Sequence, residues 1–98
     1  MTEEGKIQKK ITDHLKRNGW FTTKLMQTST NGIPDVLAVR HDQTLWIEVK
    51  TPTGRLSEIQ KFRIRELTEK YSQNVMVVYS YAEFYEKYTG KELKTKRK

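Results

Sequence analysis

Cysteine is absent from this chain, and its absence excludes several kinds of protein at once. Without cysteine there is no disulfide framework, no cysteine-ligated zinc site and no thiol nucleophile. The two histidines, His14 and His41, lack partners at zinc-binding spacing, and no glycine-rich phosphate loop is present. No apolar run approaches the ~18 residues that a membrane span needs, and the amino-terminal segment is too polar for a signal peptide. We therefore expect a soluble cytoplasmic protein.

Acidic residues are also in short supply, because 12 Asp and Glu oppose 19 Lys and Arg and leave a formal net charge of +7. A strongly basic chain has the electrostatic character of a nucleic-acid binder. Part of the excess is terminal, since segment 91–98 holds five basic residues and one Glu. We expect one domain over residues 1–90 and a basic tail over 91–98, which serves either as a solubilising end or as an arm on phosphates.

Apolar spacing and turn signals predict three helices and four strands. Ile7, Ile11 and Leu15 recur at helical spacing, and Ser57 with Gln60 matches a capping box at a helix start. The expected helices cover 3–17, 57–70 and 80–88, and the expected strands cover 20–27, 35–40, 44–51 and 75–79. Because a helix joins the last two strands, they should lie parallel. The fold class is therefore α/β, a mixed four-stranded sheet flanked by helices in the order α-β-β-β-α-β with a C-terminal helix.

Three side chains on two adjoining strands have the types that phosphodiester hydrolysis requires. Asp35 follows Pro34 at the start of one strand, and Glu48 and Lys50 share one face of the next. If the connecting turn has two residues, Asp35 lies directly opposite Glu48, with Cβ atoms about 5 Å apart. A register shifted by one residue would instead place Asp35 beside Val49.

Two opposed carboxylates repel, and a divalent cation such as Mg²⁺ would compensate that repulsion. Such a cation would polarise a phosphodiester and lower the pKa of a bound water, while Lys50 would stabilise charge in the transition state. Of three Glu-x-Lys triplets in the chain, only that of Glu48 lies in an alternating strand and follows a Pro-Asp strand entrance. The alternative interpretation of Glu48 and Lys50 is an exposed ion pair.

These residues resemble the PD-(D/E)XK nucleases, and in particular their VRR-NUC group. The resemblance runs from Glu4 to Tyr79 and includes an opening helix with Glu4 and Gln8. It also includes the Gly-x-Pro-Asp element at 32–35, the Glu-x-Lys strand at 48–50 and the helix start at 56–60. It implies a restriction-endonuclease-like fold and a chain of the stand-alone kind, bacterial or phage-encoded.

The resemblance also implies roles for individual residues. Asp35, Glu48 and the backbone carbonyl of Val49 would bind the metal, and Lys50 would be the catalytic lysine. Glu4 would assist the metal site, with Glu3 as the alternative, because both lie in the same helical turn. Gln60 would support Lys50 or contact DNA, and Gln8 would serve the same neighbourhood.

The leading hypothesis is a Mg²⁺- or Mn²⁺-dependent DNA endonuclease selective for branched DNA such as Holliday junctions. Stand-alone members resemble dimeric junction resolvases, which predicts a homodimer, and the aromatic cluster between Tyr79 and Tyr88 is the expected interface. The alternatives are a non-catalytic DNA-binding module on the same scaffold and a basic interaction domain without a nucleic-acid role. His14 is expected to be a packed, hydrogen-bonded residue.

Overall fold

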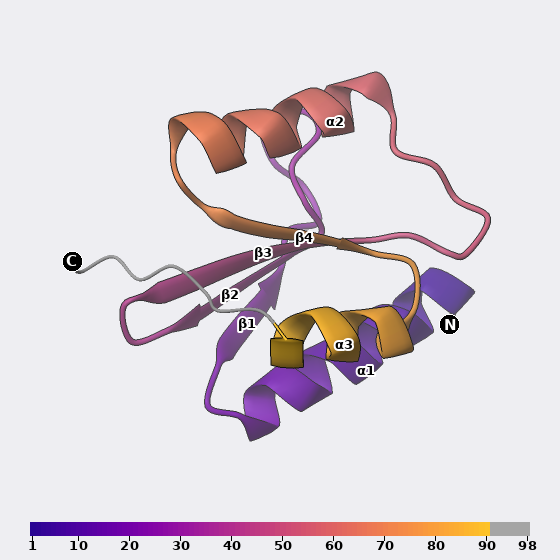
Figure 1. Ribbon diagram of the computed structural model, residues 1–98. Coiled ribbons are helices and arrows are strands. Elements are labelled where there is room, and N and C mark those ends of the chain that lie inside the picture. The colour runs from indigo at the N-terminus through magenta and orange to yellow at the C-terminus, as the bar shows by residue number, and fades with distance from the viewer. Residues whose placement is uncertain (91–98) are drawn as a thin grey trace.

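The computed structural model describes residues 1–90, and the predicted basic tail at 91–98 lies outside them. Helices and strands follow one another in the predicted order (Figure 1). Their bounds are α1 Glu3–Arg17, β1 Phe21–Lys24, β2 Val36–Arg40, β3 Gln43–Val49, α2 Glu58–Arg65 with a π-helical continuation η1 Glu66–Lys70, β4 Asn74–Val78 and α3 Tyr81–Gly90. None of the helices described is long and apolar enough to cross a membrane.

The strands form one four-stranded sheet in the order β1-β2-β3-β4. The first two pairings are antiparallel, and β4 runs parallel to β3. Helix α2 connects this parallel pair, which is the crossover that the sequence predicts. In Figure 1, α1 and α3 lie together on one side of the sheet and α2 lies on the other. The predicted α/β class with a mixed sheet and flanking helices is confirmed.

Side chains cap the first turns of α1 and α2, as the sequence predicts. Thr2 Oγ1 accepts a hydrogen bond from the Gly5 N–H at 3.0 Å. Ser57 and Gln60 form a complete capping box at the start of α2. These caps fix where α1 and α2 begin, and both helices carry candidate site residues in their first turns.

The hydrophobic core lies between the sheet and the helix pair α1 and α3. Leu45, Ile47 and Val49 are fully buried on this face of β3, as their alternation predicts. The other buried apolar residues of the core are Ile11, Leu15, Trp20, Val36, Ala38, Met76, Val78 and Phe84. The opposite face of β3 is thereby left for Glu48 and Lys50.

Helix α2 covers that opposite face less completely than its apolar residues suggest. No residue of α2 is buried, and Ile59 and Phe62 remain 42% and 47% exposed. On the sheet beneath, Trp46 and Val75 are half-buried, whereas Glu48 is buried. A carboxylate is therefore sequestered on the more open side of the sheet.

Three aromatic residues of α3 pack against the hydrophobic core: Tyr81, Phe84 and Tyr88. Phe84 is fully buried, and Tyr88 Oη accepts a hydrogen bond from Trp20 Nε1 at 2.9 Å. The ring of His14 contacts four aromatic rings of α3 edge-on, so the prediction that His14 is a packed residue is confirmed. Burial lowers the pKa of His14. Phe84 is therefore unavailable for the predicted dimer interface, whereas Tyr85 stays 49% exposed, and the interface itself stays a prediction.

Candidate active site

The hairpin between β2 and β3 decides which side chains meet across the site. His41 and Asp42 form its turn, and Arg40 pairs with Gln43, as predicted. His41 takes a φ of 55°, the left-handed backbone that a tight two-residue hairpin turn uses. The shifted register considered from the sequence is therefore excluded.

Asp35 is fixed at the residue before β2 begins. The observed ladder, continued by one residue, places it opposite Glu48. Its Oδ2 accepts a hydrogen bond from the backbone N–H of Val49 at 2.9 Å, and its carbonyl oxygen accepts one from the N–H of Leu25 at 2.8 Å. With Pro34 buried just before it, the carboxylate is held by main chain and side chain at the end of β3.

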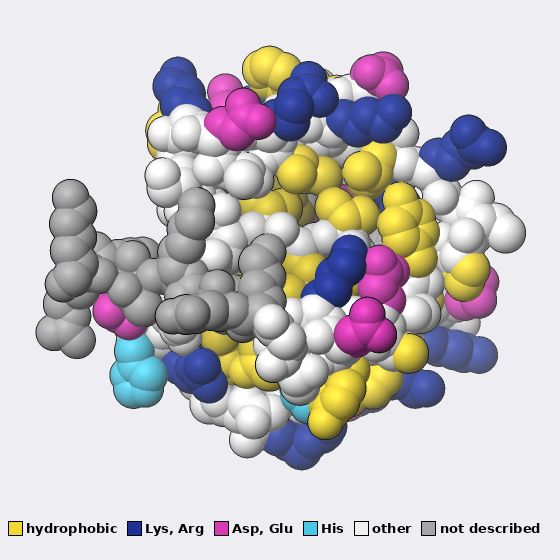
Figure 2. All heavy atoms as spheres, in the orientation of Figure 1, with side chains coloured by type: hydrophobic (Ala, Val, Ile, Leu, Met, Phe, Trp, Pro, Cys, Tyr) yellow, Lys and Arg dark blue, Asp and Glu magenta, His cyan; other side chains and the backbone are white. Residues whose placement is uncertain are grey.

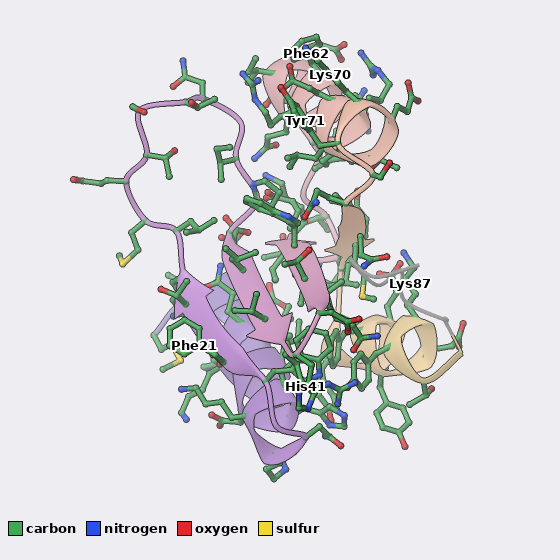
Figure 3. All side chains as sticks on the ribbon, turned by 90° about the vertical axis from the view of Figure 1, so that its left-hand side faces the viewer. Phe21, His41, Phe62, Lys70, Tyr71 and Lys87 are labelled. Carbon is green, nitrogen blue, oxygen red and sulfur yellow. The ribbon has the colours of Figure 1, made fainter. Side chains whose placement is uncertain are left out.

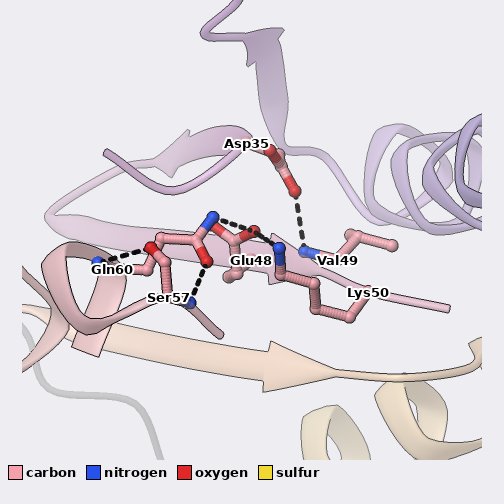
Figure 4. Close-up of polar contacts among 6 residues, drawn as sticks. All are labelled: Asp35, Glu48, Val49, Lys50, Ser57 and Gln60. Atoms are coloured by element: carbon pink, nitrogen blue, oxygen red, sulfur yellow. Dashed lines mark hydrogen bonds and ion pairs between the residues drawn. The ribbon is translucent and has the colours of Figure 1, made fainter. Parts of the chain in front are cut away.

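Glu48 is 1% exposed and lies between two positively polarised groups. Its Oε2 accepts a hydrogen bond from Gln60 Nε2 at 3.3 Å and lies 3.8 Å from Lys50 Nζ (Figure 4). Its Oε1 is buried without a hydrogen-bond partner in the described part of the chain. An unpartnered buried carboxylate oxygen is costly, so this atom requires a proton or a cation. The interpretation of Glu48 and Lys50 as an exposed ion pair is wrong.

The pKa of Glu48 is raised from 4.5 to about 8, and burial is the largest cause. The charge of Asp35 and a hydrogen bond between protonated Glu48 and Asp35 contribute to this rise, whereas Lys50 opposes it. At neutral pH and without a cation, Glu48 is therefore mostly protonated.

The donor set fits a divalent cation. Asp35 and Glu48 offer hard oxygen ligands, and Glu48 Oε1 is the oxygen that has no hydrogen-bond partner in the part of the chain that the structure describes. The N–H of Val49 points at Asp35, and because N–H and C=O of a strand residue face the same neighbour, the Val49 carbonyl faces this side too. Within residues 1–90 no three acidic or histidine side chains gather closely enough to hold a metal. A cation here would draw further oxygens from the backbone and from water.

Glu4 approaches the site from the first turn of α1. It is half-buried, whereas Glu3 is exposed. The charge of Glu4 contributes to the raised pKa of Glu48. Gln8, one helical turn later on the same side, is half-buried as well. Of the two glutamates considered, the structure favours Glu4 as the neighbour of the carboxylate pair.

The side-chain amide of Gln60 makes two hydrogen bonds, and the one to Ser57 sets the direction of the one to Glu48. Its Oε1 accepts a hydrogen bond from the Ser57 N–H at 2.8 Å, which completes the capping box. Because the amide oxygen is fixed there, the amide nitrogen is directed at Glu48. A local helix-start signal thus orients a residue of the site.

Two contacts between the loop before Asp35 and helix α2 were missed from the sequence. Arg63 Nε donates a hydrogen bond to the Asn31 carbonyl at 3.0 Å. Gly32 has a φ of +79° and packs so tightly that an added Cβ would lie 2.7 Å from the Ile59 carbonyl oxygen. Gly32 belongs to the Gly-x-Pro-Asp element. The one sequence signal for its contact with α2 was Arg63, a basic residue one helical turn after Gln60.

Replacing Gly32 with alanine is expected to destabilise the protein by roughly 2–4 kcal/mol, because a positive φ and a backbone clash both penalise the new methyl group. Gly19→Ala is the matched control, since its φ is +85° but the added Cβ would meet only a side-chain carbon at 3.7 Å. That variant should lose about 1–2 kcal/mol. Urea unfolding measures both, and equal losses would contradict tight docking of the loop on α2.

Comparison with protein families matches residues 2–82 to the VRR-NUC domain. A solved structure described as a VRR_NUC domain superimposes with a TM-score of 0.81, at 26% identity, covering 94% of this chain and 100% of that chain. Comparison with curated proteins finds no significant match. The matched region includes α1, the whole sheet and α2, and so every element that carries a candidate site residue. This chain therefore belongs to the VRR-NUC family of nuclease-type domains.

Proposed function

We propose that this protein is a Mg²⁺- or Mn²⁺-dependent DNA endonuclease with a PD-(D/E)XK site. One observation carries the proposal: a buried Glu48 carboxylate, opposite Asp35 and paired with Lys50, keeps one oxygen without a hydrogen-bond partner among residues 1–90. A purely structural ion pair would have no need of a second carboxylate facing it. A divalent cation would neutralise both and use the unpartnered oxygen.

Each residue of the site has a separate role in the proposed reaction. A cation held by Asp35, Glu48 and the Val49 carbonyl would supply Lewis-acid assistance to phosphodiester hydrolysis. Lys50 stabilises the negative charge that develops on the phosphate oxygens or orients the attacking water. Gln60 holds Glu48 in place, and Glu4 adds negative charge that favours cation binding.

We further propose a homodimer that acts on branched DNA, such as a Holliday junction, in the cytoplasm of a bacterial cell. Two sites related by a twofold axis would suit paired cuts in a symmetric junction. Support for a dimer comes from exposed apolar side chains on α2 and just after η1: Ile59, Phe62 and Tyr71, the last 54% exposed. Phe62 and Tyr71 lie at the same end of the molecule in Figure 3, and Figure 2 shows hydrophobic side chains gathered beneath α2.

A cleavage panel tests the proposed function. Duplex, flap, single-stranded and four-way-junction DNA are incubated at fixed salt with Mg²⁺, Mn²⁺ or EDTA. We expect metal-dependent cleavage that is fastest on the junction. Asp35→Ala should lose this cleavage, and it should also lose the heat of Mn²⁺ binding in calorimetry. Metal-independent DNA binding without cleavage would instead indicate the non-catalytic module. Weak, salt-independent DNA retention would exclude a nucleic-acid role.

The double role of Gln60 leads to a prediction that separates helix capping from catalysis. Gln60→Glu keeps an oxygen for the Ser57 N–H but turns a negative charge toward Glu48, so cleavage should fall about 10–100-fold. Ser57→Ala removes only the cap and should cost about 1 kcal/mol of stability with little change in rate. Single-turnover rates and urea unfolding measure the two effects. If Ser57→Ala slows cleavage as much as Gln60→Glu, the link from Gln60 to Glu48 is not functional.

A further inference from the structure

A second group of polar and basic side chains surrounds a pocket of about 250 Å³. Its lining residues are Gly54, Arg55, Leu56, Lys61 and Tyr79. The first three belong to the connection between β3 and α2, Lys61 lies on α2, and Tyr79 follows β4. Three segments of the chain thus meet around a space that the carboxylate site does not use.

The strand register places this pocket beside Lys50. The Lys50 N–H donates to the Val78 carbonyl at 2.9 Å, and the parallel ladder pairs Val49 with Val78. The next residue of β4, Tyr79, therefore comes alongside Lys50. Since β2 and β4 flank β3 on opposite sides, the pocket lies across Lys50 from Asp35.

The chemistry of the lining suits an anion. Arg55 and Lys61 are cations, Tyr79 has a hydroxyl donor, and none of the lining residues is acidic. Two other pockets of the described surface each include Asp or Glu in their lining. Lys61 does pair with Glu58 at 3.1 Å, but the Glu58 side chain is 91% exposed, and such exposed pairs are weak. Lys61 can therefore exchange Glu58 for a stronger anion.

We propose that this pocket binds a backbone phosphate of the DNA strand next to the phosphate that is cut. The proposal rests on the proposed nuclease function, and it adds a substrate-binding subsite formed by Arg55, Lys61 and Tyr79. A phosphate held there would fix the strand on one side of Lys50 while the carboxylate pair lies on the other. Phosphate contacts position a nucleic acid without reading its sequence, so the subsite should act on any sequence.

The test compares the parent with Arg55→Ala/Lys61→Ala in binding and in cleavage. Both side chains are exposed, so the double variant should fold, which circular dichroism checks. We expect KM to rise about tenfold with kcat within about twofold, and the salt slope of DNA affinity in EDTA to fall by about two. Lys9→Ala/Lys70→Ala removes the same charge elsewhere. Glu58→Gln, which takes the competing carboxylate away from Lys61, should tighten binding.

A methylphosphonate scan identifies the phosphate itself. Single neutral methylphosphonates are placed at successive positions along the DNA strand, and affinity is measured in EDTA. A methylphosphonate at one position should weaken DNA binding by the parent and by the Lys9→Ala/Lys70→Ala control. The same substitution should not change the affinity of Arg55→Ala/Lys61→Ala. If the double variant keeps the parent's position dependence and KM, the subsite is overturned. If the parent cuts no DNA, the nuclease proposal fails, whereas the binding scan still decides the subsite.

Discussion

Replacing Lys50 by alanine is expected to slow DNA cleavage about 100–1000-fold while leaving the fold and the DNA affinity nearly unchanged. The Lys50 side chain is 18% exposed, and its Nζ is held 3.8 Å from Glu48 Oε2. In this position its charge is preorganised beside the place where a bound phosphate would develop negative charge. DNA affinity depends on many phosphate contacts, so the loss of one ammonium group should affect it little. Single-turnover cleavage at saturating Mg²⁺ measures the chemical step directly.

Two comparisons separate catalysis by Lys50 from a purely structural role. Lys9→Ala, on the exposed side of α1, removes an equal charge and should cut at the parental rate. Titration with Mn²⁺ should show that Lys50→Ala still binds the ion, because removal of a neighbouring cation does not weaken the carboxylate ligands. Parental cleavage by Lys50→Ala would overturn the assigned mechanism. Loss of Mn²⁺ binding would instead mean that Lys50 organises the carboxylates.

The fold follows from the sequence where local signals agree with one another. Helix α1 has the predicted bounds because the cap at Thr2 and the four-residue apolar spacing indicate the same start and the same face. The β2–β3 register follows from a two-residue turn, and that register decides the position of Asp35. Strand β1 is shorter than predicted, since after Lys24 the chain leaves the sheet for the loop that docks on α2.

The site is predictable in its members but not in its environment. Strand alternation places Glu48 and Lys50 on one face, yet alternation does not reveal that Glu48 is buried while α2 above it is not. That burial depends on how α2 packs across the sheet, and the contact from Gln60 to Glu48 spans 12 residues. The contact from Arg63 to Asn31 spans 32 residues. Contacts of this kind arise from tertiary packing, for which a single sequence has no periodic signal.

Glu48 is expected to make the metal-free protein less stable as the pH rises. Its pKa is about 8 in the folded chain against an ordinary value of 4.5, so between these values the folded state binds more protons than the unfolded state. Stability therefore falls with rising pH across this window. The contribution is fully present below about pH 4.5 and is lost as the pH rises through 8. The loss should be on the order of 5 kcal/mol.

Urea unfolding in EDTA between about pH 5 and 9 measures this loss against Glu48→Gln, which replaces the carboxyl by a neutral group of the same shape. His14 acts in the opposite direction, because burial lowers its pKa, and the comparison cancels it since both proteins retain it. Glu48→Gln should match the parent near pH 5 and exceed it near pH 9. It should also cut no DNA. If the stability of the parent and of Glu48→Gln changed with pH in the same way, Glu48 would not be protonated in the folded chain.

Metal binding should reverse this titration. To act as a ligand, Glu48 must lose its proton, so Mn²⁺ binding near pH 7 should release close to one proton per site. Calorimetry in buffers of different ionisation enthalpy counts that proton, and Glu48→Gln should show neither the proton nor the binding heat. With Mn²⁺ saturating, the fall in parental stability toward pH 9 should disappear. A parent that binds Mn²⁺ without releasing a proton would place the cation away from Glu48, and the unpartnered oxygen would then have no catalytic meaning.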